Sequence, residues 1–415
     1  MSRRVVVTGL GGVTPLGTGV RLSWERLLKG ESGIARIEHF DASAFTCQIA
    51  GEVRDFNPLD YVDKKETKRM DRFTQFALAS AAMAMEEADC PINEDNAHRI
   101  GCLLGVGLGG LSTLERNHAA LLHAGPGRVS PFFVPMLISN MAAGQVCIRF
   151  GLRGPNSCVS TACAAGTHAI GDAYRLIQRG EADVMLAGGC EAAVTPLGLG
   201  GFCAMRALSR RNDAPQQASR PFDKGRDGFV MGEGAGILVL EELHQARRRG
   251  ARIYAELVGY GMSADAHHMT QPDPEARGVA LCMQHALHDA ALAPHEVDYI
   301  NAHGTATPYN DKYETLAIHK VFGAHAHRLL VSSTKSMTGH LFGGAGGVEG
   351  MFTVLAIAHD VVPPTINWEM RDEDCDLDYV PNIARSTPVT VAMSNSLGFG
   401  GTNASIIFKK YTEAA

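Results

Sequence analysis

The chain has 415 residues, 45% of them hydrophobic and 20% charged, which is enough apolar material for one large core or two fused ones. Its net charge of −6 argues against a general nucleic-acid binder. No apolar run is long enough to span a membrane, and ten cysteines without CxxC spacing indicate free thiols in a reducing compartment instead of a disulfide framework.

The first predicted elements are a strand, a short helix and an irregular segment. Residues 4–10 (RVVVTGL) form an apolar strand, which the glycines of the following LGG are expected to end. Residues 1–4 lead directly into this strand, which argues against a signal peptide and predicts a cytoplasmic protein. Residues 23–29 fit a short helix, and residues 39–61 are irregular.

A longer helix is predicted for residues 64–88, because apolar side chains recur there at helical spacing. Its first turns carry five cations: Lys64, Lys65, Lys68, Arg69 and Arg72. Cations at a helix N-terminus oppose the macrodipole, so the cluster is locally unfavourable. A solvated face and a docking patch for an acidic partner explain it about equally well.

Residues 100–104 form the next apolar strand, and the glycine-rich residues 105–110 (GVGLGG) follow it. This stretch lacks the GxGxxG unit that a dinucleotide requires and the lysine of a P-loop, which argues against a phosphate cradle. Residues 130–150 predict one helix, and residues 198–201 predict a loop.

The stretch that organises the chain is NSCVSTACAAGTHAIGDAYRLIQRG, at residues 156–180. It predicts a short strand, an abrupt turn at Cys163 and a helix. Such a turn presents its residue to a substrate, as in the nucleophile elbow of hydrolases. The helix N-terminus favours the thiolate, which is the reactive form. Cys163 is therefore a candidate nucleophile, and a buried structural cysteine is the alternative.

Near Ala251 the pattern starts again. Residues 254–262 (YAELVGYGM) resemble the first strand in kind, and further strands and helices alternate to the C-terminus. This indicates an internal duplication with α/β layers. We expect two halves, residues 1–250 and residues 251–415.

The second half adds three glycine-rich motifs. HGTATP contains His303, KSMTGH contains Lys335 and His340, and GFGGTN spans residues 398–403. His340 is expected near a helix N-terminus, which keeps its imidazole neutral and able to donate a hydrogen bond. One cysteine and two histidines at separate turns favour a catalytic site. No HxxxH, HExxH or CxxC spacing supports a catalytic metal.

TACAAG, HGTATP, KSMTGH and GFGGTN, in this order, closely resemble the β-ketoacyl-acyl-carrier-protein synthases, and the resemblance covers nearly the whole chain. The stretches ASRPFDKGRDGFVMGEGAG and AELVGYGMSADAHHMT are most similar to the synthase II branch. The resemblance implies a thiolase-like fold of five αβαβα layers built from two similar halves, usually as a homodimer. It implies an acyltransferase that works on acyl- and malonyl-loaded carrier protein without a cofactor.

The resemblance also implies roles at the reaction centre. Cys163 would carry the acyl group, and His303 and His340 would donate hydrogen bonds to the malonyl thioester oxygen. The backbone N–H groups of Cys163 and Phe399 would form an oxyanion hole. Lys335 would support the site by pairing with Glu349.

Further roles follow from the same resemblance. Thr305, Thr307 and Thr270 match residues that contact the pantetheine arm, although turn capping also explains the first two. Leu108, Phe202 and Phe399 match acyl-pocket or gate positions, for which core packing is the alternative. A larger set also matches: a structural cation would lie near Asn301, Glu349, Ser394 and Asn395. Apart from the resemblance, a basic cluster on an otherwise acidic protein predicts that the acidic carrier docks on Lys64, Lys65, Lys68 and Arg69, together with Arg128 and Arg206.

The chain departs from the family pattern in three places. Asn310 precedes Asp311 where the family usually has glycine, Leu397 stands where phenylalanine is common, and Phe342-Gly-Gly replaces the more usual Leu-Gly-Ala. None of these changes removes a catalytic group, and each can tune acyl-chain preference.

Three other functions remain open at this point. A ketosynthase of a dissociated polyketide or specialised lipid pathway shares all four motifs. A non-catalytic subunit of the chain-length-factor type would act by binding alone, and the intact Cys163 argues against it. A thiolase acting on coenzyme A needs a second cysteine as base, where this chain has two histidines.

Overall fold

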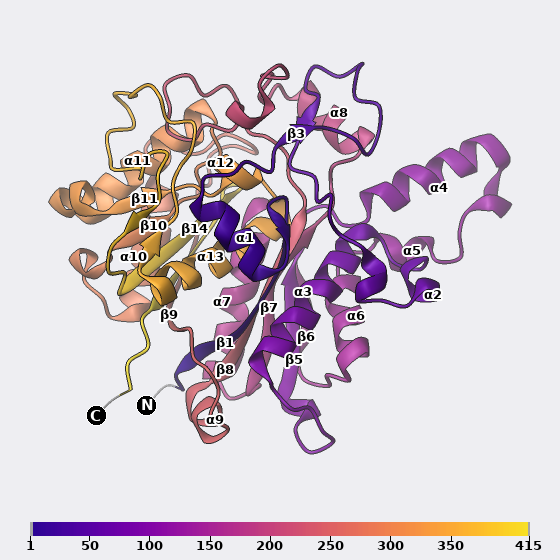
Figure 1. Ribbon diagram of the computed structural model, residues 1–415, viewed down its shortest axis with the longest axis horizontal. Helices are drawn as coiled ribbons and strands as arrows, with labels where there is room; N and C mark the ends of the chain where they lie inside the picture. The colour runs from indigo at the N-terminus through magenta and orange to yellow at the C-terminus, as the bar shows by residue number, and fades with distance from the viewer. Residues whose placement is uncertain (1–2, 414–415) are drawn as a thin grey trace.

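The computed structural model describes residues 3–413, and its main sheet contains the same strand pattern twice (Figure 1). The first copy consists of β1 (Val5–Thr14), β5 (Ile100–Gly105), β6 (Asn156–Val159), β7 (Val184–Glu191) and β8 (Gly234–Glu242). The second consists of β9 (Ala255–Ala264), β10 (Tyr299–Asn301), β11 (Leu330–Ser332), β14 (Val391–Gly398) and β15 (Thr402–Lys409).

The topology confirms the predicted duplication. Numbered within its own half, each copy has the strand order 3-2-4-5-1. In both copies the second strand is parallel to its two neighbours and the fifth is antiparallel to its two neighbours. The copies join where β1 pairs with β9 in antiparallel register.

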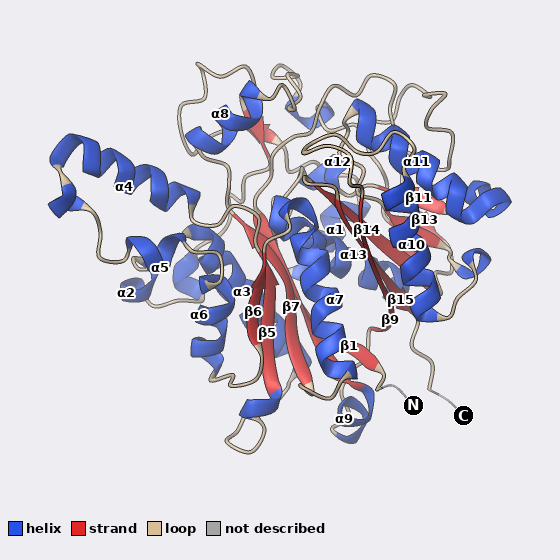
Figure 2. Ribbon diagram, turned by 180° about the vertical axis from the view of Figure 1, so that it is seen from behind, coloured by secondary structure: helices blue, strands red, loops and turns tan. Residues whose placement is uncertain are grey.

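Helices complete five layers, as the family resemblance implies. One outer layer contains α3 (Arg72–Ala88) and α6 (Met141–Phe150), and the other contains α10 (Arg277–Ala290) and α11 (Pro308–Phe322). The middle layer, between the two halves of the sheet, contains α7 (Ala165–Gln178) and α13 (Ala345–His359) (Figure 2). Every side of α13 is buried from Ala345 to Ile357, as expected of a helix that is apolar all round.

The first strand of each half does not end at its glycines, contrary to the sequence expectation. β1 continues to Thr14, and a Cβ on Gly11 would lie 1.8 Å from the Ser80 carbonyl oxygen of α3. In β9, a Cβ on Gly261 would lie 2.1 Å from the Cys282 carbonyl oxygen of α10. These glycines therefore allow a helix to pack directly on the strand, in the same way in both halves.

The single helix predicted for residues 64–88 is wrong. The chain forms α2 (Lys64–Thr67), then a break, and then α3. Asp71 takes an extended conformation before α3, and its carboxylate accepts hydrogen bonds from the Thr113 N–H and hydroxyl, at 3.0 and 2.6 Å. This contact holds the start of α4 (Leu111–Ala124) and interrupts the helix.

The single helix predicted for residues 130–150 is also wrong. It is divided into α5 (Phe133–Leu137) and α6, with Ile138 extended between them. The Leu137 carbonyl accepts a hydrogen bond from the Gly110 N–H at 3.0 Å, so the break receives the end of the glycine-rich loop.

Several helices were absent from the prediction. α8 (Pro196–Ala204) occupies the predicted loop, because Thr195 caps it by accepting the Gly198 N–H and Pro196 suits its first turn. α4 and α11 were also not predicted. The remaining helices are α1 (Val20–Leu28), α9 (Leu243–Arg248) and α12 (Lys335–Thr338). The two-residue strands are β2 (Gly17–Thr18), β3 (Ala35–Arg36), β4 (Ile49–Ala50), β12 (Val361–Val362) and β13 (Arg385–Ser386).

Two further observations concern the whole described chain. Within residues 3–413, no helix is both long enough and apolar enough to cross a membrane. All ten cysteines are free, as their spacing predicts.

Candidate active site

Cys163 lies in a sharp turn between β6 and α7. A 3-10 helix (Ala162–Ala164) makes the turn, and Ala162 is held at a φ of +50°, a conformation that costs energy in a residue with a Cβ. The predicted elbow is therefore present. The side chain is not pushed outward, however, because Cys163 is only 8% exposed and lies at the wall of a cavity.

The environment of Cys163 favours the neutral thiol. Burial raises its pKa to about 12, although the charge of Lys335 and hydrogen bonds from the backbone N–H groups of Phe399 and Cys163 lower it. Burial therefore opposes the thiolate that the helix N-terminus favours. These two N–H groups are the predicted oxyanion donors, and their oxyanion role stays a prediction.

The two predicted histidines face the same cavity from separate turns. The rings of His303 and His340 are nearly perpendicular, with centroids 5.3 Å apart, and both residues are buried. Burial, followed by the charge of Lys335, holds both pKa values well below the usual range for histidine. Both rings therefore favour the neutral form, which the sequence predicted for His340 alone, and desolvation is the main cause in each case.

Lys335 and Glu349 form a buried ion pair behind the histidines. Lys335 Nζ contacts Glu349 Oε1 and lies 3.5 Å from His303 Nδ1. Neither residue lines the cavity. The predicted pairing is therefore present, and its cation lies close enough to His303 to oppose protonation of that ring.

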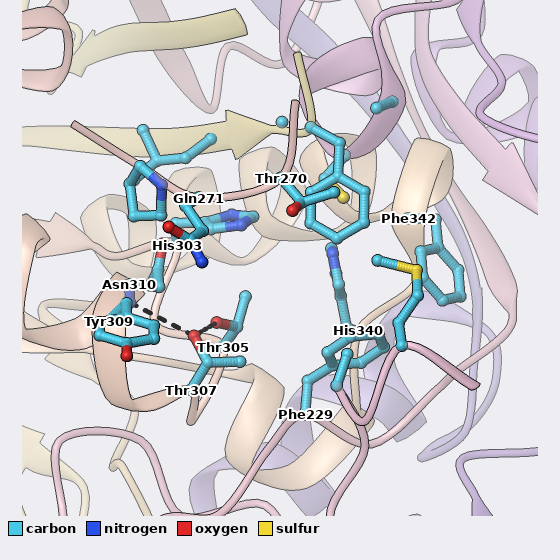
Figure 3. Close-up of a pocket in the computed structure, with 18 of the residues that line it drawn as sticks. Phe229, Thr270, Gln271, His303, Thr305, Thr307, Tyr309, Asn310, His340 and Phe342 are labelled. Carbon is cyan, nitrogen blue, oxygen red and sulfur yellow. Dashed lines mark hydrogen bonds between the residues drawn. The ribbon is translucent and has the colours of Figure 1, made fainter. Parts of the chain in front are cut away.

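The cavity has a volume of about 460 Å³ and contains most of the predicted pocket residues. Its lining includes Cys163, His303, His340, Leu108, Phe202, Phe399, Thr270, Thr305, Thr307 and Arg206. Figure 3 shows Thr305, Thr307 and Asn310 along one side and Phe229, His340 and Phe342 along the other. Segments from both halves of the chain therefore build one site.

One wall of the cavity is aromatic. Phe202 from α8 stacks on Phe342 with ring centroids 5.0 Å apart, and Phe229 meets both rings edge-on. Phe229 was not among the predicted residues. Phe342 was noted only as a departure from the family motif, and its size was the sequence signal that could have marked it as part of this wall.

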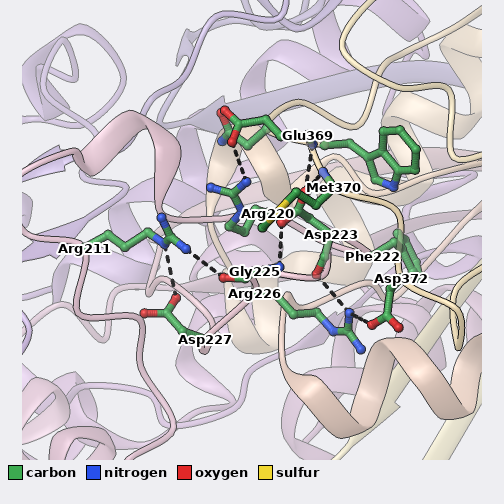
Figure 4. Close-up of polar contacts among 12 residues, drawn as sticks. Arg211, Arg220, Phe222, Asp223, Gly225, Arg226, Asp227, Glu369, Met370 and Asp372 are labelled. Atoms are coloured by element: carbon green, nitrogen blue, oxygen red, sulfur yellow. Dashed lines mark hydrogen bonds and ion pairs between the residues drawn. The ribbon is translucent and has the colours of Figure 1, made fainter.

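The rim of the cavity is fixed by a polar network. The Thr305 and Thr307 hydroxyls are 3.0 Å apart, and Thr307 caps α11. Arg226 donates to the Thr307 and Pro308 carbonyls, at 3.2 and 3.1 Å, and pairs with Asp372. Figure 4 shows this arginine within a network that joins residues 211–227 to residues 369–372.

Two buried glutamates that were not predicted hold the loops of the site. Glu314 accepts the N–H groups of His303 and Gly304, at 2.8 and 2.9 Å. Glu191 accepts N–H groups from four residues at 2.7 to 3.2 Å: Gly107, Leu108, Gly109 and Gly343. Burial raises the pKa of each carboxyl to about 7, although these hydrogen bonds lower it. Neither Glu191 nor Glu314 lies in a motif, so the sequence gave no signal that either residue holds a loop of the site.

Three of the four residues predicted to surround a structural cation have an oxygen that is free to bind it, and the fourth does not. Asn301 Oδ1, Glu349 Oε2 and Ser394 Oγ are buried and have no hydrogen-bond partner within the described part of the chain, which suits a bound cation. Asn395 Oδ1, in contrast, accepts a hydrogen bond from Ser405. The donor set that fits a cation therefore consists of the first three residues.

The predicted docking cations lie mostly at the surface. Lys64, Lys65, Lys68, Arg128 and Arg206 are exposed. Arg69 is half-buried, pairs with Glu66 and lies over the Phe132 ring. Lys68 and Arg69 come after the end of α2 and do not lie at the start of a long helix. The argument that a helix dipole makes their charges unfavourable therefore does not hold for these two residues.

The fold and the site together define a thiolase-like condensing enzyme, with a cysteine and two neutral histidines in one cavity. Family models support this class over most of the chain. The β-ketoacyl synthase N-terminal domain matches residues 2–246, and the C-terminal domain matches residues 254–369. The chain belongs to the β-ketoacyl synthase family.

Curated relatives resemble nearly the whole chain. The 3-oxoacyl-[acyl-carrier-protein] synthase 2 of Synechocystis sp. is 56% identical over 99% of this chain and 98% of its own length. The enzyme of the same name from Coxiella burnetii is also 56% identical, over 98% of this chain and 99% of its own length.

Solved structures share the fold. A type II polyketide ketosynthase, determined in complex with its acyl carrier protein, has a TM-score of 0.93 at 37% identity and covers 99% of this chain and 100% of its own. A β-ketoacyl synthase from Burkholderia phymatum has a TM-score of 0.91 at 35% identity, with the same coverage of each chain.

Replacing Glu191 by glutamine is expected to destabilise the protein by about 1–3 kcal/mol, because an amide nitrogen would then face backbone donors. The raised pKa means that the folded protein binds this proton more tightly than the unfolded chain does. The carboxyl's contribution to stability is therefore full below its ordinary value of 4.5 and is lost as the pH rises through about 7. Glutamine does not titrate there, so the stability gap should narrow between pH 5 and 8.

Chemical denaturation across this pH range measures the gap, with the exposed Glu373→Gln as the matched control. A gap that stays constant with pH would show that the Glu191 carboxyl does not titrate in this interval.

Proposed function

We propose that the protein elongates fatty acids by condensing a cysteine-bound acyl chain with malonyl-acyl-carrier protein, which gives 3-oxoacyl-acyl-carrier protein and carbon dioxide. The observation that carries this proposal is that Cys163 and two neutral histidines open into one cavity. The identity of 56% to two 3-oxoacyl-[acyl-carrier-protein] synthases 2, over nearly their full lengths, supports the same activity and substrate.

The first step is acyl transfer to Cys163. The sulfur forms a bond to the thioester carbonyl carbon, the carrier sulfur leaves, and the Cys163 proton ends on the carrier thiol. Because the exchange is neutral overall, it suits a site that favours the neutral thiol. The N–H groups of Cys163 and Phe399 stabilise the oxyanion.

The second step is loss of carbon dioxide from the malonyl group. Negative charge moves to the thioester oxygen, where His303 and His340 donate hydrogen bonds. The Lys335–Glu349 pair positions this part of the site and opposes protonation of the histidines. The resulting carbanion attacks the acyl carbonyl carbon, and the Cys163 sulfur leaves and is reprotonated.

The remaining predicted roles depend on position. Thr270, Thr305 and Thr307 line the rim, where their hydroxyls hydrogen-bond a pantetheine arm. Leu108, Phe202 and Phe399 line the acyl end. The division into residues 1–250 and 251–415 separates the nucleophile from the histidines.

A bound cation beside Glu349 is part of this proposal. Asn301, Glu349 and Ser394 would hold it through their unpartnered oxygens, and it would supply positive charge to Glu349 Oε2, the carboxylate oxygen that has no hydrogen-bond partner. Asn301→Ala should lower the melting temperature more in a cation-containing buffer than in a tetraalkylammonium buffer. An equal loss in both buffers argues against the cation.

The exposed apolar surface supports a homodimer. β6 is an edge strand of the sheet, and α4 and the segment after it project from the flank of the body that carries α5 and α6 (Figure 1). Large apolar side chains on this side are exposed: Leu121, Leu122, Phe132, Val134, Ile138 and Ile148. Such a surface and an unpaired strand edge both favour association.

Among the alternatives, a thiolase is disfavoured because, among the described lining residues, Cys163 is the one cysteine of the cavity. A silent subunit is disfavoured by the intact Cys163. A polyketide ketosynthase shares the fold at 37% identity, below the 56% of the fatty acid enzymes. Condensation of acyl carriers of different lengths with malonyl carrier, followed by mass spectrometry, separates the pathways.

Cys163→Ala should abolish acyl transfer and leave some malonyl decarboxylation, because the histidines lie on separate turns. His303→Ala and His340→Ala should retain the acyl adduct and lose decarboxylation, at about 3 kcal/mol of barrier for each donor. Intact-mass spectrometry and carbon dioxide release measure both steps. An adduct on Cys163→Ala at the wild-type stoichiometry would refute the nucleophile.

Reversing Lys65 and Lys68 to glutamate should raise KM for carrier-bound substrate on the order of tenfold, because an acidic carrier loses attraction. The effect should shrink at high salt and should be absent with a short pantetheine thioester. Arg247→Glu with Arg248→Glu is the matched control, because these exposed cations lie on α9. Equal loss on both substrates would indicate a folding defect.

Leu108→Phe should reduce the use of long acyl carriers and leave short primers unaffected, because Leu108 lines the cavity and is 47% exposed. Each methylene that enters the tunnel is worth about 0.8 kcal/mol, so narrowing it penalises long chains most. The chain-length profile is measured beside the melting temperature. A loss of activity that is equal at all chain lengths and follows the loss of stability would show that Leu108 has a packing role only.

Ile148→Glu with Leu122→Glu should convert a dimer into monomers, because both side chains are exposed on the proposed interface. Light scattering after gel filtration measures the mass. Ile383→Glu is the control, since it places the same charge on an apolar side chain, 78% exposed, on another surface. A wild-type protein that elutes as a monomer contradicts the homodimer directly.

A further inference from the structure

Three potential metal ligands gather outside the cavity, near the C-terminal end of α11. They are His319 on α11, His327 on the 3-10 helix Gly323–Arg328, and Asp376 on the loop between β12 and β13. One ligand atom from each residue lies within 4.8 Å of the others. None of the three lines the cavity, so the cluster has no part in the proposed condensation.

The contacts within the cluster point to one centre. His319 Nε2 and Asp376 Oδ1 are 2.6 Å apart, and the His319 and His327 rings have centroids 5.2 Å apart. Within residues 3–413, no hydrogen bond engages the His327 ring. A simple His–Asp ion pair explains why His319 lies against Asp376. It does not explain why the ring of His327 lies against the ring of His319.

The neighbouring histidine makes the arrangement more specific. His325 belongs to the same segment as His327, two residues earlier, yet its Nε2 lies 2.9 Å from the Val297 carbonyl and is engaged there. His327 is therefore the histidine of this segment that is free to bind a ligand.

The loop that carries Asp376 is held by the body of the protein. Asp372 pairs with Arg226, as Figure 4 shows, and Asp374 pairs with Lys312 of α11 at 2.9 Å. On the other side of Asp376, Asp378 bridges to Leu330 of β11 and pairs with Arg385. The carboxylate is thus positioned by contacts on both sides before any metal binds.

We propose that His319, His327 and Asp376 bind one divalent transition-metal ion of the Zn²⁺ class. Two imidazoles and one carboxylate suit Zn²⁺ and the neighbouring late first-row ions, and water completes the coordination. Zinc binds such ligands at about 2.0–2.2 Å, so small side-chain rotations bring the three atoms into its shell. The ion ties the end of α11 to the loop of residues 372–378, and its role is structural.

The test uses the untagged full-length protein after removal of metal with a chelator. Calorimetry with ZnCl₂ should show that the wild type binds one equivalent of Zn²⁺. His327→Ala and Asp376→Asn should each lower the affinity for Zn²⁺ by roughly 100-fold, because the loss of a ligand costs at least as much as the loss of a residue that hydrogen-bonds a ligand. His295→Ala removes another exposed imidazole and should bind as the wild type does. Zn²⁺ should raise the melting temperature of the wild type and of His295→Ala only.

Titration with CoCl₂ identifies the ligands. Ligand-field absorption without a thiolate charge-transfer band is expected, and it should disappear in His327→Ala. A thiolate band would assign the metal to a cysteine and overturn the proposal. So would zinc binding that His327→Ala and Asp376→Asn leave unchanged, or the absence of saturable binding in the wild type. His327 is exposed, so its removal is not expected to impair folding.

Discussion

The site depends on direct backbone contact between its turns, which only glycine permits. A Cβ on Gly166, at the start of α7, would lie 2.8 Å from the Gly343 carbonyl oxygen and from the Gly347 N–H nitrogen. A Cβ on Gly189 of β7 would lie 2.1 Å from the same Gly343 oxygen. Without side chains at these contacts, the turn with Cys163 and the turn with His340 come together at one cavity, although they belong to different halves of the chain.

This close packing buries the reactive side chains, and their desolvation is the largest influence on their protonation. Cys163, His303 and His340 are all shifted toward their neutral forms, with burial as the largest cause in each case. The ammonium group of Lys335, 3.5 Å from His303 Nδ1, is matched by Glu349 and is itself buried. Neutral, buried donors suit a reaction in which negative charge develops on a thioester oxygen and then disappears.

The loops that follow corresponding strands in the two halves are each held by a buried glutamate. A buried glutamate accepts backbone N–H groups from the loop after the second strand of each half: Glu191 holds residues 107–109, and Glu314 holds His303 and Gly304. The first half thereby positions the acyl wall and the second half a histidine. The two glutamates come from elements that do not correspond, β7 and α11, so each half supports its loop with a different part of the fold.

The sequence by itself determined the general architecture and indicated the residues of the proposed site. Cys163, His303 and His340 each lie in a short motif of small residues, and local backbone geometry is enough to place such residues at turns. The repeat of an apolar, glycine-containing strand also predicted the duplication, because a strand and its packing glycines are local features. Only the tertiary structure decided what depends on distant partners. Asp71 breaks a helix because it binds Thr113, and Glu191 holds a loop far earlier in the chain. The desolvation that opposes the thiolate of Cys163 exists only after both halves have packed.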